Sequence, residues 1–385
     1  MKITVVTSYF PTSTHPYGGN SAFHTLRFLE PHASIEVICP LERYPDIRGL
    51  KPARYQRADP AWQPPEFKTT YVEYPVLPVV TRPFNGAILA RILLPYVRLS
   101  RPDLILNYWL YPDGYAAVRV GRVLSVPVIV GAIGSDIRAR NDPFTIRLVR
   151  QTMLHAAAVI TVSRELRQQA IARGIPAEKV TAILNGCDTS VFCPGDRAEA
   201  RAQVGCDPQS ELVVYVGNLL ATKGLGELMD AFIELSKSRP RLHLAIVGQG
   251  PYGETLQRRA AAAGLLERVT MPGRRDAPGV TQWMRAADVF CLPSYSEGCP
   301  NAVIEALACG RPVVSTRVGG IPELVHETCG MLVPPRDAAA LCRALDGALA
   351  KPWDTQEIAR LSSRGWEAVA ADTLAVCRQV KPSAP

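Results

Sequence analysis

Short apolar runs rich in β-branched residues alternate with segments of helical period along the whole chain. This alternation is typical of βαβ units, which build parallel sheets. The strands predicted in the first half span residues 3–8, 34–40, 69–76, 103–108, 127–134 and 157–163. Those predicted in the second half span residues 211–217, 243–248, 269–273, 288–294, 312–316 and 330–335. The pattern therefore predicts an α/β protein with two doubly wound sheets.

The polar stretch at 192–207 contains glycine and proline and predicts the join between two domains. We expect a first domain over 1–195 and a second over 196–365. Beyond residue 354 the sequence has helical period and no further strand, which predicts a pair of terminal helices. We expect the last of them, at 366–385, to pack back on the first domain.

Composition places the chain among soluble globular proteins, with 47% apolar and 20% charged residues. No run reaches the ~18 apolar residues of a membrane span, and the N-terminal MKITVVTSYFP has no secretory-signal pattern. We therefore expect a cytoplasmic protein. The 10 cysteines and 6 histidines show no metal-ligand spacing, so we expect no metal site.

Positive charge is concentrated in the first half of the chain. Residues 1–190 hold 22 Lys and Arg against 14 Asp and Glu, whereas residues 191–385 hold 21 of each. This asymmetry favours an acidic partner, such as an anionic membrane surface, a lipid-linked phosphate or nucleic acid, or else a solvated basic face. Residues 84–101 form an amphipathic segment with arginines, which could contact a membrane or pack in the core.

Glycine-containing loops follow several predicted strands, at 7–19, 134–136, 217–224, 248–251 and 296–301. In open α/β sheets, ligands bind at the carboxyl ends of strands, where glycine allows backbone amides to approach a phosphate. With two such sheets facing each other, we expect the ligand between them.

The stretch SEGCPNAVIEALACG places two glutamates around a predicted helix start. Pro300 suits the first turn of this helix and Gly310 its end. The free amides near that start form an anion site. Glu297 and Glu305, on either side of it, would bind hydroxyls, a hexose at the loop and a ribose at the helix. The alternative is that Glu297 caps the helix and Glu305 forms a salt bridge.

The longer stretch SEGCPNAVIEALACGRPVVSTRVGGIPELV resembles the donor-binding signature of retaining glycosyltransferases of family 4, which have the two-domain GT-B fold. The resemblance implies that Glu297 contacts sugar hydroxyls and that Glu305 binds the ribose. It also implies that the backbone of four residues binds phosphate: Gly298, Cys299, Pro300 and Asn301. The fold class implied is GT-B, with two Rossmann-like domains.

The segment VVYVGNLLATKGLGELMDAF resembles the family's G-R-x4-K-G motif. The resemblance places Gly217 and Lys223 at the donor and implies that Lys223 grips the diphosphate and compensates the charge of the leaving nucleotide. Asn218 stands where the family commonly has arginine. It can donate hydrogen bonds to the diphosphate, but it carries no charge.

Further matches extend over most of the chain. Gly18 and Gly19 resemble the paired glycines that face the donor phosphates and the acceptor, and Gly273 with Arg274 matches the loop that holds the base. YPDG and GSD resemble a subgroup that includes the teichuronic acid biosynthesis glycosyltransferase. Asp136 is an acceptor-site candidate or a helix N-cap. Ile133 replaces a histidine or arginine of many relatives.

Together these features predict a retaining glycosyltransferase that moves a hexose from a nucleotide sugar to a glycan or lipid-linked acceptor in cell-surface polysaccharide biosynthesis. Lys223, Asn218 and Glu297 are the expected catalytic residues, and Lys223, the amides at 298–301 and Asn218 would carry most of the catalysis. We expect no cofactor, no metal and no nucleic acid partner, a UDP-sugar rather than a GDP-sugar, and leave open peripheral contact of the basic half with an anionic membrane. The alternatives are a nucleotide-sugar 2-epimerase and an inactive nucleotide-sugar-binding subunit.

Overall fold

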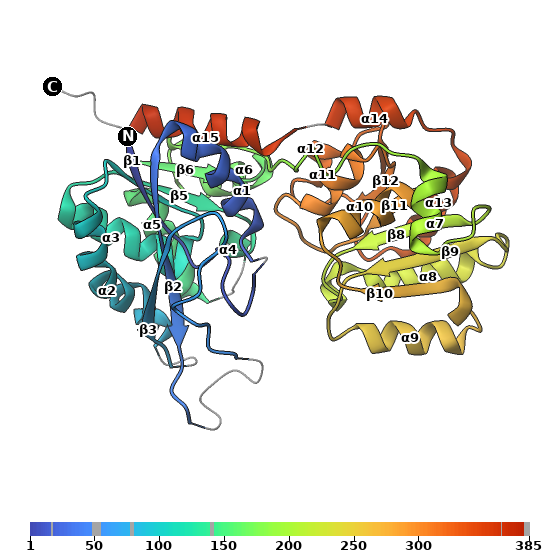
Figure 1. The fold of residues 1–385 in the computed structure, drawn as a ribbon, viewed down its shortest axis with the longest axis horizontal. Helices are drawn as coiled ribbons and strands as arrows, with labels where there is room; N and C mark the ends of the chain where they lie inside the picture. The colour runs from blue at the N-terminus through green and yellow to red at the C-terminus, as the bar shows by residue number, and fades with distance from the viewer. Residues whose placement is uncertain (17, 48–54, 78–80, 139–141, 363, 381–385) are drawn as a thin grey trace. The chain divides into compact units, whose positions relative to one another are not determined.

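The chain folds into two compact units. A computed structural model describes residues 1–16, 18–47, 55–77, 81–138, 142–362 and 364–380 (Figure 1). Unit 1 comprises Met1–Leu184 and Trp366–Pro385, and unit 2 comprises Asn185–Gly365. Residues 381–385, the end of the expected terminal helix, lie outside the described residues.

The division between the units falls at Leu184–Asn185, ahead of the expected 195/196 boundary. Residues 185–195 belong to unit 2 because their backbone bonds to it. The amide of Cys187 donates to the carbonyl of Arg364 at 3.0 Å, and the carbonyl of Cys193 accepts from Arg285 Nε at 2.9 Å. Residues 185–195 have the composition of a linker, but these hydrogen bonds hold them against unit 2.

In its described part, unit 1 contains a seven-stranded parallel sheet in the order β3-β2-β1-β4-β5-β6-β7. Its strands are β1 (Lys2–Val6), β2 (Ser34–Arg43), β3 (Thr69–Pro75), β4 (Leu104–Asn107), β5 (Val128–Ala132), β6 (Ala158–Thr161) and β7 (Val180–Ala182). Its helices are α1 (Asn20–Leu29), α2 (Asn85–Ser100), α3 (Tyr115–Leu124), α4 (Ser135–Arg138), α5 (Pro143–His155), α6 (Arg164–Ala172) and α15 (Trp366–Val380). Short helical turns are η1 (Glu30–His32), η2 (Arg82–Phe84), η3 (Leu110–Gly114) and η4 (Ala177–Lys179).

Helices cover both faces of this sheet, so its strands are apolar on both sides. Successive residues of β1 point to opposite faces: Val5 joins a core cluster with α1 and α15, and Val6 joins another with α2, α3, α5 and α6. In Figure 1, α15 lies beside α1, far from it in sequence. Leu93 of α2 is fully buried, which is worth about 1.5–3 kcal/mol relative to exposure.

Unit 2 contains, among the described residues, a six-stranded parallel sheet in the order β10-β9-β8-β11-β12-β13. Its strands are β8 (Glu211–Val216), β9 (Leu242–Val247), β10 (Val269–Gly273), β11 (Val289–Leu292), β12 (Val313–Thr316) and β13 (Gly330–Val333). Its helices are α7 (Arg197–Val204), α8 (Leu225–Leu235), α9 (Gly253–Ala262), α10 (Ala277–Ala286), α11 (Asn301–Ala308), α12 (Ile321–Leu324), α13 (Ala338–Ala350) and α14 (Thr355–Ser362), with the turns η5 (Ala221–Lys223) and η6 (Leu266–Arg268).

The prediction of two doubly wound parallel sheets is confirmed. Each of the twelve predicted strands overlaps an observed one, and only β7 was missed among the described strands. The strand order reverses between β1 and β4 in unit 1 and between β8 and β11 in unit 2. Loops leaving the two strands at such a switch point diverge, so a crevice opens outside their carboxyl ends.

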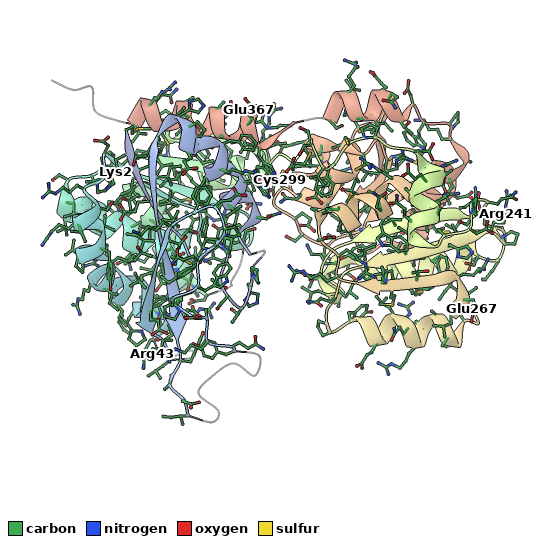
Figure 2. All side chains as sticks on the ribbon, in the orientation of Figure 1. Lys2, Arg43, Arg241, Glu267, Cys299 and Glu367 are labelled. Carbon is green, nitrogen blue, oxygen red and sulfur yellow. The ribbon has the colours of Figure 1, made fainter. Side chains whose placement is uncertain are left out.

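The surface carries charged side chains on both units, including Lys2 and Arg43 on unit 1 and Arg241 and Glu267 on unit 2 (Figure 2). The segment 84–101 packs in the core through one face of α2, while Leu99 on the same helix is 84% exposed. None of the helices in the described residues combines the length and the apolar composition that crossing a membrane would need.

Candidate functional site

The switch point of unit 2 brings Lys223 and Glu297 together from loops 74 residues apart in sequence. Lys223 Nζ donates to Glu297 Oε1 at 2.6 Å, and the two side chains are 25% and 11% exposed. Their loops are joined by the amide of Tyr295, which donates to the carbonyl of Thr222 at 3.0 Å. An ammonium and a carboxylate side by side at the carboxyl ends of parallel strands can bind a phosphate and a hydroxyl, respectively.

Gly224 makes this approach possible. Its φ is +68°, and a Cβ at this position would lie 1.9 Å from the carbonyl oxygen of Pro293, directly after β11. Only glycine combines that backbone conformation with so close a contact. The loop that carries Lys223 therefore rests on the end of the neighbouring strand.

The start of α11 forms the second part of the site. Pro300 is the N-cap residue and supplies no side-chain cap. The carbonyls of Gly298 and Cys299 accept from the amide of Gly320 at 2.8 Å and from Asn185 Nδ2 at 3.1 Å. Within the described chain, the amides of Gly298, Cys299 and Asn301 make no hydrogen bond. Their N–H groups and the positive end of the helix can therefore hold an anion.

Glu305 lies within α11. Burial raises its pKa from 4.5 to about 7, and no described residue donates a hydrogen bond to its carboxylate. The helix ends where sequence predicted, at Gly310, whose φ is +73° and where a Cβ would lie 2.4 Å from the carbonyl oxygen of Thr355. A desolvated carboxyl without a cation suits binding of neutral hydroxyls more than a structural ion pair.

The remaining predicted residues of unit 2 lie at the carboxyl ends of β8 and β10, and β9 runs between these two strands. Gly217 follows β8, and the amide of Gly248 after β9 donates to the carbonyl of Gly273 at 3.0 Å. Arg274 is exposed at this edge, as is Asn218, whose carbonyl accepts from Tyr215 Oη at 2.9 Å. The structure thus brings all the predicted donor residues of unit 2 to one edge of the sheet, and their roles stay predictions.

Three predicted site residues lie in unit 1. Gly19 is the N-cap residue of α1 and has a φ of +65°, and a Cβ there would lie 2.3 Å from the carbonyl oxygen of Tyr9; Gly18 precedes it. Asp136 accepts from the amides of Ile133, Gly134 and Ile137 at 2.9–3.1 Å. These bonds tie Asp136, the second residue of α4 and not its N-cap, to the loop after β5, while its acceptor role stays a prediction.

Comparison with known proteins identifies the family. The pattern described as "Glycosyltransferase Family 4" matches residues 51–191, and that of "Glycosyl transferases group 1" matches residues 210–351. TuaC of Bacillus subtilis (strain 168), named for teichuronic acid biosynthesis, is 30% identical over 90% of this chain and 88% of its own. The chain belongs to glycosyltransferase family 4. It is therefore a transferase, as the sequence predicted.

Further relatives of this family 4 member match a shorter part. The D-inositol 3-phosphate glycosyltransferase of Kribbella flavida is 33% identical over 53% of this chain, which spans about half of that protein. Among solved structures, the sucrose-phosphate synthase of Thermosynechococcus elongatus has a TM-score of 0.76 with 21% identity and 99% coverage of both chains. Anabaena Alr3699/HepE, solved in complex with UDP and glucose, has a TM-score of 0.70 with 21% identity, covering 99% of this chain and 98% of its own. These likenesses confirm the GT-B fold.

Sequence reasoning missed Asn185 of this glycosyltransferase. Its Nδ2 donates to the carbonyl of Cys299 at 3.1 Å and to Asn301 Oδ1 at 2.8 Å, so the first residue of unit 2 holds the loop at the start of α11. It also missed Tyr295, whose hydroxyl donates to Glu227 at 2.6 Å and whose ring lies 4.7 Å from the Arg336 guanidinium. No local spacing indicates these contacts.

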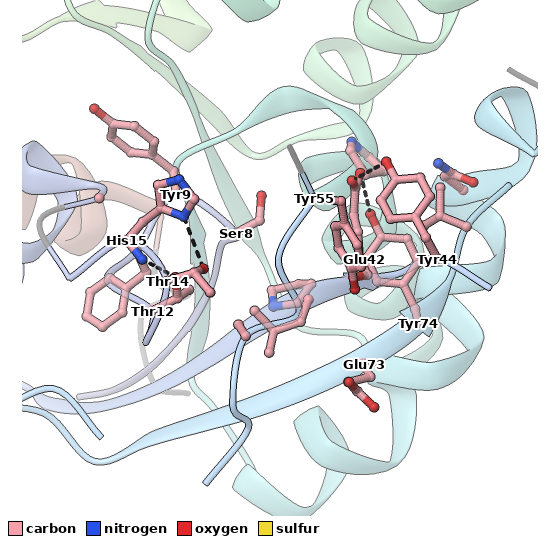
Figure 3. Close-up of a pocket in the computed structure, with 18 of the residues that line it drawn as sticks. Ser8, Tyr9, Thr12, Thr14, His15, Glu42, Tyr44, Tyr55, Glu73 and Tyr74 are labelled. Carbon is pink, nitrogen blue, oxygen red and sulfur yellow. Dashed lines mark hydrogen bonds between the residues drawn. The ribbon is translucent and has the colours of Figure 1, made fainter. Parts of the chain in front are cut away.

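The glycosyltransferase also has a cavity of about 720 Å³ in unit 1 (Figure 3). It lies at the carboxyl ends of β1, β2, β3 and β4, which includes the switch point of this sheet. Gly18 and Gly19 line it, together with several tyrosines, Trp109, Glu42 and Glu73. The cavity has the size and mixed lining of a small-molecule site.

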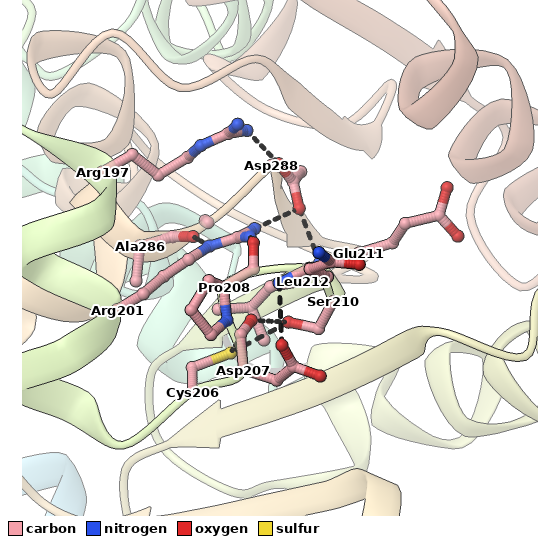
Figure 4. A network of polar contacts seen from close by, with 12 residues as sticks. Arg197, Arg201, Cys206, Asp207, Pro208, Ser210, Glu211, Leu212, Ala286 and Asp288 are labelled. Carbon is pink, nitrogen blue, oxygen red and sulfur yellow. Dashed lines mark hydrogen bonds and ion pairs between the residues drawn. The ribbon is translucent and has the colours of Figure 1, made fainter.

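A second charged cluster in unit 2 is structural (Figure 4). Arg201 of α7, 3% exposed, donates to Asp288 Oδ2 at 2.6 Å and to the carbonyl of Ala286 at 3.1 Å. The same carboxylate accepts from the amide of Leu212 at 2.7 Å and pairs with Arg197, which is 54% exposed. The cluster fixes α7 to the starts of β8 and β11, the amino ends of the strands, away from the crevice edge.

Proposed function

We propose that this glycosyltransferase retains the configuration of the transferred sugar and moves a hexose from a UDP-sugar to a glycan or lipid-linked acceptor of a cell-surface polysaccharide. The observation that carries the proposal is the Lys223–Glu297 contact of 2.6 Å beside the open start of α11. A nucleoside diphosphate would draw Lys223 and the amides to its phosphates and leave Glu297 to the sugar. The names of TuaC and of the UDP-bound HepE structures support the acceptor class and the nucleotide.

In this mechanism the protein stabilises the leaving diphosphate rather than forming a covalent bond. As the glycosidic C–O bond breaks, negative charge grows on the β-phosphate oxygens. Lys223 and the amides of Gly298 and Asn301 would balance that charge. Asn218 would add a hydrogen bond without a charge. Glu305, deeper in α11, would accept from ribose hydroxyls.

A thermal-shift screen against UDP, GDP and their common sugars, followed by transfer assays with NMR of the anomeric proton, tests the proposal. UDP should stabilise the protein more than GDP does, and the product should keep the donor's configuration. We expect Lys223→Ala to lower kcat about 10²–10³-fold. The control is Lys237→Ala. Lys237 is 67% exposed and pairs with Glu234 on the surface, so its loss should leave kcat unchanged. Inversion, or a preference for GDP, would contradict the proposal.

Glu297 gives a second test because it faces both Lys223 and the proposed sugar. Glu297→Gln removes the ion pair and so frees the ammonium for phosphate, which should leave UDP affinity equal or higher. It weakens hydroxyl binding, which should lower transfer. A variant with wild-type transfer would exclude the sugar-binding role of Glu297.

We also propose that unit 1 contacts anionic membrane through adjoining surfaces of α2 and α3. Leu99 is 84% exposed and Val123 is 63% exposed, and Arg98, Arg119 and Arg122 are exposed on the same two helices. Apolar side chains among arginines suit an interface with acidic lipid headgroups. Sedimentation with phosphatidylglycerol vesicles should exceed that with phosphatidylcholine vesicles, and Leu99→Ser with Arg98→Ser should remove the difference. Equal sedimentation with both would exclude the contact.

A further inference from the structure

The cavity of unit 1 lies where the sheet offers a ligand site, and of the residues expected at the donor only Gly18 and Gly19 line it. Its volume is about 720 Å³, and its walls come from the segments that leave β1, β2, β3 and β4. The chain turns in opposite directions after β1 and β4, so this crevice exists before any side chain is considered. The inference that follows rests on the proposed function, because it names the acceptor that such an enzyme would use.

Aromatic side chains form two walls of the cavity. Tyr9 and Trp109 stack with ring centroids 6.4 Å apart, and Tyr44 and Tyr55 meet edge to face at 4.8 Å. Figure 3 shows Tyr9 on one side and Tyr44 and Tyr55 on the other. Rigid rings with a polar edge suit a ligand that has apolar C–H faces and hydroxyl edges, which is the surface of a sugar ring.

Glu42 is the hydroxyl acceptor on the second wall. Its carboxylate accepts from the hydroxyl of Tyr44 at 2.7 Å and more weakly from that of Tyr74 at 3.4 Å. Burial, followed by the bond to Glu42, raises the pKa of Tyr44, so this hydroxyl stays a donor. A carboxylate has about four lone-pair positions, and Glu42 therefore retains capacity for ligand hydroxyls.

The cavity also has polar atoms that the protein leaves unpaired. Asn85, the first residue of α2, is only 6% exposed and lines the cavity, yet no described residue bonds to its Oδ1. Arg82 also lines the cavity, and no described residue accepts a hydrogen bond from its Nε. A buried polar atom without a partner costs about 1–3 kcal/mol, which a bound hydroxyl would recover.

The charges of the cavity balance, which disfavours a phosphate. Arg57 is held by Glu73 through two bonds of 2.8 and 2.9 Å, so its charge is cancelled. The remaining pair of lining charges is Glu42 and Arg82. A dianion would meet two carboxylates here and only one arginine that is not already paired.

We propose that this cavity binds a neutral sugar ring of the acceptor, between the aromatic walls and with hydroxyls on Glu42 and Asn85. Any phosphate or lipid of the acceptor would then lie outside the cavity. The proposal separates this enzyme from an enzyme that takes a phosphorylated acceptor in the same place.

Saturation-transfer NMR with the full chain tests it, using the methyl glycosides of glucose, galactose and N-acetylglucosamine as probes and glucose 6-phosphate and D-inositol 3-phosphate as charged counterparts. At least one neutral glycoside should bind more tightly than both phosphates. Glu42→Gln and Asn85→Ala should each weaken it about tenfold, as expected for loss of one hydrogen bond to the ligand. Glu36→Gln, on the same strand but paired with Lys2, is the matched control and should change nothing.

Tighter binding of a phosphate, no binding of any neutral probe, or binding unchanged in both cavity variants would overturn the proposal. Circular dichroism and the thermal shift with UDP should stay at wild-type values in both variants, because donor residues are untouched. If UDP and GDP fail to bind while glycosides bind through Glu42, the proposed donor function is wrong and the saccharide site stands.

Discussion

Replacing Glu305 with glutamine should remove a loss of folding stability that the wild type shows as pH rises. Burial raises the pKa of this carboxyl from 4.5 to about 7. Between these values the folded protein holds a proton that the unfolded chain has released. Stability therefore falls as pH rises through this window and is constant above it. A glutamine stays neutral and avoids the penalty.

The size of the effect follows from the pKa. One pKa unit corresponds to about 1.36 kcal/mol, so a rise from 4.5 to about 7 lowers the stability of the ionised form by roughly 3 kcal/mol. Part of this penalty is already present at mildly acidic pH. From roughly pH 5.5 to 8.5, the stability advantage of Glu305→Gln over the wild type should therefore grow by about 2 kcal/mol. This corresponds to about 4–8 °C in the difference between the two melting temperatures for a unit of this size.

Thermal unfolding of both proteins across this pH range measures the gain, with Glu267→Gln as the matched control. Glu267 is exposed in η6 (Figure 2), so its replacement should change the free energy of unfolding by less than about 0.5 kcal/mol. If the difference between Glu305→Gln and the wild type did not vary with pH, the carboxyl of Glu305 would not be desolvated and the reasoning would be refuted. UDP titrations add a second readout: ribose hydroxyls favour the ionised carboxylate, so UDP should bind more tightly as pH rises through 7, and the variant should lose this dependence.

Three further substitutions test other parts of unit 2. Gly224→Ala should lower the free energy of unfolding in urea by about 2 kcal/mol or more and weaken UDP binding, because the new Cβ would meet the carbonyl oxygen of Pro293. The control is Gly264→Ala, which has the same φ of +68° and nothing within 4 Å of the new Cβ. This control should show only the cost of the backbone conformation. Arg201→Met should cost about 3–5 kcal/mol in the same assay because it leaves Asp288 partly buried with a weaker partner, whereas Arg197→Met, at a residue 54% exposed, should cost less than about 1 kcal/mol; equal costs would contradict the role of burial. Asn185→Asp should raise the Kd for UDP more than Asn185→Ala, because its carboxylate would face the carbonyl of Cys299 and Asn301 Oδ1, and calorimetry that found the reverse order would exclude the tie to α11.

Most of the fold could be predicted from sequence because both sheets are buried on both faces. Continuous apolar strands such as β5 and β11, separated by helices of clear period, leave few alternatives. Strand β7 was missed because its three residues lie at the edge of the sheet, where a short run with two half-buried positions has no distinctive pattern. The domain boundary was misplaced because composition cannot show that Cys187 and Cys193 bond to unit 2.

The site divides in the same way. Pro300 and Gly310 act through local backbone geometry at the two ends of α11, which the sequence reports directly. Asn185 acts through a contact 114 residues away with Cys299, and no spacing rule encodes such a distance. The cavity of unit 1 combines segments that leave four strands, including residues such as Glu42 and Asn85 that are far apart in sequence. Its recognition required the packed structure.

The part of the proposed donor site that would hold the phosphates, around Lys223 and the start of α11, has little net side-chain charge, although a nucleoside diphosphate is strongly anionic. Lys223 is paired with Glu297, and Asn218 occupies the position where a second cation is common in the family. Glu305 adds no positive charge. The attraction for phosphate must then come mainly from the amides at the start of α11 and the helix dipole behind them. Amide donors are fixed by the backbone and need no reorganisation as charge develops, so a neutral Asn218 is compatible with catalysis provided that Asn185 and Gly224 hold the two loops in place.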